Sequence, residues 1–199
     1  MQLTERFYDS IVYALQLHSK QYRKVVGGVP YASHLLGVAS IVMDYGGDEE
    51  EAIGALLHDS VEDQNVTVSD IEKRFGRRVA MIVEGCTDTD QKPKPPWLER
   101  KSRYIAHLRA GVPPEVRLVS MADKLHNARS TLANLRSMGD AIWENFKGGK
   151  EGTLWYLRSL VNTYRASGSD PLLDELDRTV TEIENLSGAK PELQREHLH

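Results

Sequence analysis

Histidine and aspartate side chains directly follow an apolar run in the stretch GALLHDSVED, residues 54–63. The run ALL at 55–57 belongs in a core, yet His58 and Asp59 come next. Burying even a neutral polar group without a partner costs about 2–7 kcal/mol, so these side chains need compensation. A bound metal ion would supply it.

Two further side chains extend this candidate metal site. His34 stands at the start of a predicted helix, and Asp123 follows the apolar run LVSMA just as Asp59 follows its own. Two imidazoles and two carboxylates suit Mn²⁺ or Fe²⁺ in six-coordination, with room for water and a substrate oxygen, whereas zinc prefers fewer ligands. On the alternative reading, His34 bonds a backbone group and both aspartates pair with arginine or lysine.

An acidic pair lies four residues beyond the His-Asp pair. Glu62 and Asp63 would share a helical face with His58 and Asp59, because a helix turns about 100° per residue. We therefore expect both carboxylates to point toward the metal, where they could take a proton from water or give one to a leaving group. The alternative is an ordinary acidic last turn, although acidic groups there oppose the helix dipole.

The segment that carries Asp123 offers further polar groups. Asn127 and Ser130 follow Asp123 at i+4 and i+7, so an amide and a hydroxyl share its face and could read a nucleotide. Lys124 and His126 are interpreted as lying off that face, and His126 as a core histidine rather than a ligand.

A basic pair precedes the first candidate ligand. Arg23 and Lys24 stand just before the glycine turn that leads to His34. There they could hold phosphate or stack on a base. The alternative is a solvated basic pair at a helix end.

Helical spacing of apolar residues positions these groups. The predicted helices cover residues 3–24, 33–45, 49–63, 70–75, 78–86, 97–108, 115–135, 142–146, 152–165 and 171–186. Thr4, Asp48 and Asp170 are candidate N-caps, and the proline-rich segment 91–96 is a predicted loop. Since no stretch alternates with a period of two, the sequence predicts an all-α bundle of eight or more helices.

Length and composition favour one domain, residues 1–166, with a helix and polar tail at 167–199 that belong to it or form a packing appendage. The last helix would pack on the body or on a second subunit, so a homodimer stays open. A net charge of −4 from 25 basic and 29 acidic interspersed residues argues against a nucleic-acid polymer or membrane surface as partner. A single cysteine, Cys86, excludes an intramolecular disulfide, and no apolar run reaches the roughly 20 residues of a membrane span. We expect a cytoplasmic protein.

With these residues in place, the chain resembles the HD-domain metallohydrolases, and more narrowly the hydrolase domain of RelA/SpoT proteins in its stand-alone form, the small alarmone hydrolases. The similarity runs from about residue 5 to 165. It rests on HSKQYRK at 18–24, PYASHLLGVA at 30–39, ALLHDSVED at 55–63, FGRRVAMIVEGCTD at 75–88 and VSMADKLHNARS at 119–130. The combination separates this branch from deoxynucleotidases and HD-GYP phosphodiesterases.

The resemblance implies hydrolysis of the 3′-pyrophosphate of ppGpp or pppGpp, which gives GDP or GTP and pyrophosphate. It implies Mn²⁺ held by His34, His58, Asp59 and Asp123, with Glu62 and Asp63 as the catalytic acidic pair. The implied nucleotide contacts are Arg23, Lys24, Asn127 and Ser130, and Arg100 or Lys101 is expected near the polyphosphate.

Two departures from the family pattern leave the base preference open. Leu35 stands where proline is usual, and the segment VVGGVP after Lys24 is longer than in the bifunctional enzymes. The alternatives are an HD phosphohydrolase acting on adenine alarmones such as ppApp or on NADPH, and a non-catalytic nucleotide-binding protein.

Overall fold

The computed structural model describes residues 2–25 and 27–188, so most of the predicted polar tail, residues 189–199, lies outside it. The described residues form helices and no β-strand, which confirms the all-α prediction. In chain order the helices are α1 (Glu5–Leu17), α2 (Ala32–Asp44), α3 (Glu49–Leu57), α4 (Ser60–Asp63), α5 (Val68–Phe75), α6 (Arg77–Cys86), α7 (Trp97–Arg109), α8 (Pro114–Met138), the 3₁₀-helix η1 (Gly139–Asn145), α9 (Gly149–Ala166) and α10 (Pro171–Leu186).

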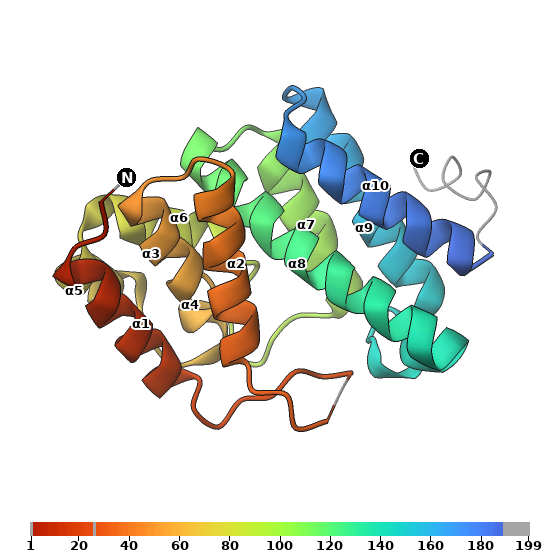
Figure 1. The fold of residues 1–199 in the computed structure, drawn as a ribbon, viewed down its shortest axis with the longest axis horizontal. Helices are drawn as coiled ribbons and strands as arrows, with labels where there is room; N and C mark the ends of the chain where they lie inside the picture. The colour runs from red at the N-terminus through yellow and green to blue at the C-terminus, as the bar shows by residue number, and fades with distance from the viewer. Residues whose placement is uncertain (1, 26, 189–199) are drawn as a thin grey trace.

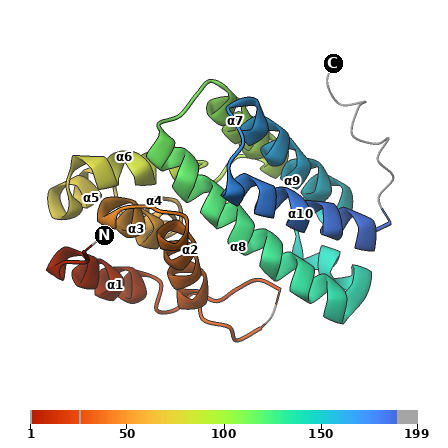
Figure 2. The ribbon, with the colours of Figure 1, turned by 45° about the horizontal axis from the view of Figure 1, so that its top comes forward.

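Helix α8 is the axis of the fold. Its 25 residues span about 38 Å at 1.5 Å per residue. Figure 1 shows α1–α6 gathered on one side and α7, α9 and α10 on the other, with α8 running across both groups, and the turned view in Figure 2 agrees. Because α2, α3, α6 and α10 all pack against it, α8 buries apolar residues around much of its circumference.

Close helix packing fixes the position of α3, the helix that leads to His58. Ala52, Ile53 and Leu56 are buried along it. Gly54 faces α6, where a Cβ atom would come within 2.6 Å of the Ile82 Cγ2 atom. The missing side chain therefore lets α3 approach α6 closely, and the end of α3 is held against the core.

The first helix is shorter than predicted. Thr4 caps α1 as expected, but the helix ends at Leu17 rather than near residue 24. The chain instead doubles back, since the Arg23 amide donates to the Val29 carbonyl and the Tyr31 amide donates to the Gln21 carbonyl, both at 2.9 Å. This short pairing brings the start of α2 beside the end of α1.

The predicted single helix over 49–63 is also wrong, because it is broken between α3 and α4 at His58 and Asp59. Side chains there compete for backbone carbonyls: His58 Nδ1 donates to the Ala55 carbonyl at 2.8 Å, and the Ser60 hydroxyl donates to the Leu57 carbonyl at 2.6 Å. The break presents both His58 and Asp59 to the interior.

Helix α10 packs on the body of the same chain, against α8 and α9. Its predicted N-cap is confirmed, because the Asp170 carboxylate accepts from the Leu173 amide at 2.9 Å. The apolar stripe that includes Leu176 and Val180 is buried in this contact. Within the described residues, every helix is too short or too polar to cross a membrane.

Candidate functional site

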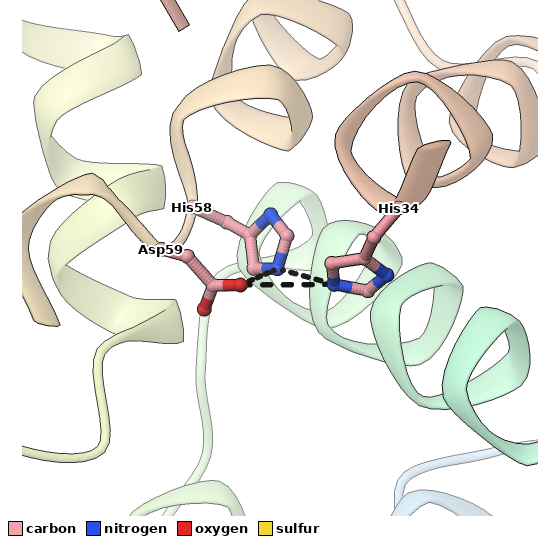
Figure 3. Close-up of side chains that lie close together, drawn as sticks. All are labelled: His34, His58 and Asp59. Atoms are coloured by element: carbon pink, nitrogen blue, oxygen red, sulfur yellow. Dashed lines mark hydrogen bonds and ion pairs between the residues drawn. The ribbon is translucent and has the colours of Figure 1, made fainter. Parts of the chain in front are cut away.

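Three of the predicted ligand side chains converge where α2 meets the α3–α4 junction. Figure 3 shows His34, His58 and Asp59 pointing toward one another, and one ligand atom from each lies within 4.8 Å of the others. His58 Nε2 is 3.3 Å from His34 Nε2 and 3.1 Å from Asp59 Oδ2. Both imidazoles are almost completely buried, at 1% and 2% exposed. The structure therefore brings the first three residues together.

The fourth predicted ligand, Asp123, reaches the same point from α8. Its Oδ1 atom is 3.3 Å from His34 Nε2 and 3.6 Å from His58 Nε2. Its Oδ2 atom is 2.6 Å from the ammonium of the adjacent Lys124. One oxygen thus faces the imidazoles and the other is held by a lysine.

The protonation of this cluster indicates a place for positive charge. Burial lowers the pKa of His34, which favours its neutral, ligating form. For His58, burial acts in the same direction, but the charges of Asp59 and Asp123 outweigh it and raise the pKa well above the ordinary value. The carboxylates of Asp59 and Asp123 thus favour positive charge at this point, which a divalent cation would supply.

The donor set fits such a cation. His58 Nδ1–H is bonded to the Ala55 carbonyl, which leaves Nε2 facing Asp59 and His34. Two imidazole nitrogens and two carboxylate oxygens suit a divalent first-row metal, while the carboxylates exclude a purely soft-ligand site.

Two neighbours of the cluster were missed or misread from the sequence. Tyr31 donates its hydroxyl to Asp59 Oδ2 at 2.5 Å, and its position three residues before His34 at a helix start is the signal that could have found it. His126 Nδ1 lies 2.9 Å from His34 Nδ1. The interpretation that His126 lies off the Asp123 face was wrong, because two residues three positions apart point in directions only about 60° apart around the helix axis.

The predicted acidic pair lies beside the cluster but is bridged by a lysine. Lys94, from the proline-rich loop, contacts Glu62 Oε1 at 2.8 Å and Asp63 Oδ1 at 2.9 Å. Burial raises the pKa of Glu62, and the negative charges of Asp88 and Asp59 raise it further. Glu62 is thus a stronger base than an exposed glutamate. A lysine in a loop gives no periodic signal, so Lys94 could not be assigned from the sequence.

Arg100 and Lys101 lie close to this acidic pair. Arg100 Nη1 is 2.5 Å from both carboxylate oxygens of Asp88 and 3.6 Å from Glu62 Oε1. Lys101 Nζ is 2.6 Å from Asp88 Oδ2. Both cations therefore face carboxylates of the protein, and Asp88 is the buried acid that holds them.

The remaining predicted contacts lie along α8 and the loop before α2. Arg23 Nη2 donates to Asn127 Oδ1 at 2.9 Å, and Asn127 Nδ2 donates to Asp123 Oδ1 at 2.5 Å. The two hydrogen bonds thus link Arg23 through Asn127 to a candidate ligand, Asp123. Lys24 is exposed, and Ser130 is half-buried on α8, seven residues beyond Asp123.

The pair formed by Lys124 and Asp123 leads to a prediction on stability. Lys124→Met is expected to lower the free energy of unfolding of the metal-free protein by about 3 kcal/mol, because it leaves a buried carboxylate without its lysine. Lys101→Met is the matched control, since Asp88 keeps Arg100 as a permanent cation and the loss should therefore be clearly smaller. Chemical unfolding in EDTA measures both, and equal losses would contradict the prediction.

Known proteins similar to this chain share its fold and sequence pattern. A sequence profile of the HD domain matches residues 10–154. The guanosine-3′,5′-bis(diphosphate) 3′-pyrophosphohydrolase of Xenopus tropicalis is 42% identical over 119 residues, 59% of this chain and 64% of that protein. The human protein of that description is 39% identical, with the same coverage of 59% and 64%. The chain thus matches less than two thirds of the length of these relatives.

Two solved structures resemble this fold. One, described as a metazoan orthologue of SpoT that hydrolyses ppGpp, is 26% identical, with a TM-score of 0.74 over 96% of this chain and 99% of that one. The other, from Listeria monocytogenes, is 35% identical, with a TM-score of 0.69 over 76% of this chain and 99% of its own.

Proposed function

This chain belongs to the HD-domain family, and we propose that it is a metal-dependent hydrolase that removes the 3′-pyrophosphate from ppGpp and pppGpp. The activity for which the Xenopus and human relatives are named supports this substrate class. The observation that carries the proposal is the convergence of His34, His58, Asp59 and Asp123 beside the half-buried carboxylate of Glu62. A non-catalytic nucleotide-binding protein has no need of that arrangement.

His34, His58, Asp59 and Asp123 would hold the metal, for which we propose Mn²⁺, with Fe²⁺ or another divalent ion as the alternative. When bound, the ion supplies Lewis acidity that polarises a phosphoryl oxygen and lowers the pKa of water. The buried imidazoles exclude solvent from one side of the site.

Glu62 is the proposed general base. In hydrolysis the oxygen of water attacks the phosphorus attached to the ribose 3′-oxygen. A new bond forms between the water oxygen and phosphorus, and the bond between phosphorus and the 3′-oxygen breaks. Glu62 accepts the proton that water loses, and its raised pKa makes it suited to return a proton to the leaving 3′-oxygen. Asp63 is proposed to assist it, and the Lys94 ammonium offsets the negative charge that the diphosphate adds beside both acids.

Arg23, Lys24 and Asn127 are the proposed nucleoside and phosphate contacts. Arg23 lies over the Tyr31 ring, 5.8 Å from its centroid, and donates to Asn127 Oδ1, so its planar guanidinium lies near the site and could stack on a base. Ser130, Arg100 and Lys101 complete the proposed contacts, with Arg100 held against Glu62 and Asp88.

We expect the protein to convert ppGpp into GDP and pyrophosphate in equal amounts when Mn²⁺ is added, and EDTA to abolish this conversion because the chain's carboxylates alone cannot polarise the phosphoryl group. Chromatography of the products, on a panel of ppGpp, ppApp, NADPH and deoxynucleotides, measures it. Re-addition of Mn²⁺ after EDTA is the control. Protein with bound Mn²⁺ that cleaves none of these compounds would refute the proposal.

A further inference from the structure

The imidazole of His34 is contacted at both ring nitrogens from a single helix. Asp123 and His126, three residues apart on α8, lie on neighbouring parts of its surface. Asp123 Oδ1 is 3.3 Å from His34 Nε2, and His126 Nδ1 is 2.9 Å from His34 Nδ1. Helix α8 therefore provides both a candidate ligand and a group that can fix the ring of another.

We propose that His126 is a positioning residue: its Nδ1 accepts the Nδ1–H of His34, so that His34 Nε2 presents its lone pair to the metal. A neutral imidazole carries one proton, and with that proton on Nε2 the ring would donate to Asp123 and could not bind the ion. Histidine ligands are commonly held in this way by an acceptor at the other nitrogen. The inference rests on the proposed metal-dependent function.

A glycine on α2 provides the space for the His126 ring. A Cβ atom at Gly37 would lie 2.3 Å from His126 Nε2 and 2.4 Å from its Cδ2, far inside any normal contact. Gly37 and His34 are three residues apart on the same helix. The surface of α2 that carries the ligand is thus also shaped to receive its partner, an observation independent of the nitrogen-to-nitrogen contact.

His126 acts through His34 and is not itself a ligand. Its Nδ1 faces the nitrogen of His34 that points away from His58, since His58 Nε2 contacts His34 Nε2 at 3.3 Å. The two rings of His126 and His34 are in contact, with centroids 4.9 Å apart. Loss of the hydrogen-bond acceptor at His126 should therefore weaken metal binding although every metal ligand is still present.

The first test compares His126→Phe, which keeps a ring but has no acceptor, with His126→Asn, whose amide oxygen can occupy the place of Nδ1. Calorimetric titration with Mn²⁺ should give an affinity lowered about 10–100-fold for His126→Phe. His126→Asn should stay within about threefold of the wild type. In the Zn²⁺-loaded wild type, ¹⁵N NMR of the His34 ring should show a protonated Nδ1 and a metal-bound Nε2.

Gly37→Ala supplies a second test in which none of the functional side chains is itself substituted. Alanine suits the helix, so the fold should hold, but its Cβ displaces the His126 ring and should weaken Mn²⁺ binding about tenfold. In the His126→Ala background, where the ring facing Gly37 is absent, the same change should cost little further affinity. Ser40→Ala, an exposed site on α2, is the matched control and should bind as the wild type.

The proposal is overturned if folded His126→Phe binds Mn²⁺ as tightly as the wild type, or if Zn²⁺-loaded His34 is protonated at Nε2. Should His126→Phe fail to fold, Gly37→Ala and the double variant decide: additive losses overturn the proposal and non-additive losses support it. These measurements need no nucleotide. A protein that passes them but leaves ppGpp intact would refute the proposed function and not the role of His126.

Discussion

Asp59→Ala is expected to abolish Mn²⁺ binding and to lower hydrolysis of ppGpp by about 10³-fold or more, while the metal-free protein remains folded. The loss of activity follows from removing one of four donors, because the ion supplies several kcal/mol of transition-state stabilisation. Stability should change by no more than about 1 kcal/mol, since the acceptor lost by the Tyr31 hydroxyl is the main cost. Asp59→Asn keeps that acceptor and should be inactive at wild-type stability.

The charges around Asp59 explain why activity should be lost while stability is kept. Among the described residues its ion-pair partners are the imidazoles of His34 and His58, which can lose a proton. Removing Asp59 therefore leaves no permanent cation unpaired, and it relieves the repulsion from Asp123.

Asp88 is the contrasting control for Asp59. It is buried between Arg100 and Lys101, so Asp88→Ala leaves two cations without their acid and should cost about 3 kcal/mol or more. Unfolding in EDTA, Mn²⁺ titration and product release measure the three properties separately. Asp59→Ala that unfolds as readily as Asp88→Ala, or that still binds Mn²⁺ tightly, would contradict the assignment of Asp59 as a ligand.

Much of the fold could be predicted from local pattern. Helix α10 was predicted with its observed bounds, because apolar spacing, a capping aspartate and Pro171 at the first turn all agree. Three of the candidate ligands, His58, Asp59 and Asp123, stood out for a related reason: an ionisable group at the end of an apolar run is a local conflict, and such conflicts concentrate at functional sites.

The rest depended on contacts between distant segments. The end of α1 is set by pairing with residues 29–31, and the break at His58 by side chains that take backbone carbonyls, neither of which alters the apolar spacing. Lys94 and His126 matter because tertiary structure brings them within 3 Å of groups 32 and 92 residues away along the chain. Spacing along one helix cannot report such neighbours.

Glu62→Gln is expected to lower kcat by about 10²–10⁴-fold, while Mn²⁺ affinity, KM and stability change little. The amide has nearly the same shape and can still accept a hydrogen bond from Lys94, but it cannot accept a proton from water. Glu62 lies outside the four-donor cluster, so its neutralisation removes the base and leaves the metal ligands in place. Glu62→Gln should therefore lower kcat and keep metal binding, whereas Asp59→Ala should lose both.

The pH dependence supplies a readout that a structural role would not give. A general base works in its deprotonated form, and burial together with Asp88 and Asp59 raises the pKa of Glu62. Wild-type kcat should fall as the pH drops through that raised pKa, and the residual rate of Glu62→Gln should lack this acidic limb. Glu99→Gln, an exposed site on α7, is the matched control and should keep the wild-type profile. If the acidic limb persists in Glu62→Gln, another group accepts the proton, and Asp63 becomes the next carboxylate to replace.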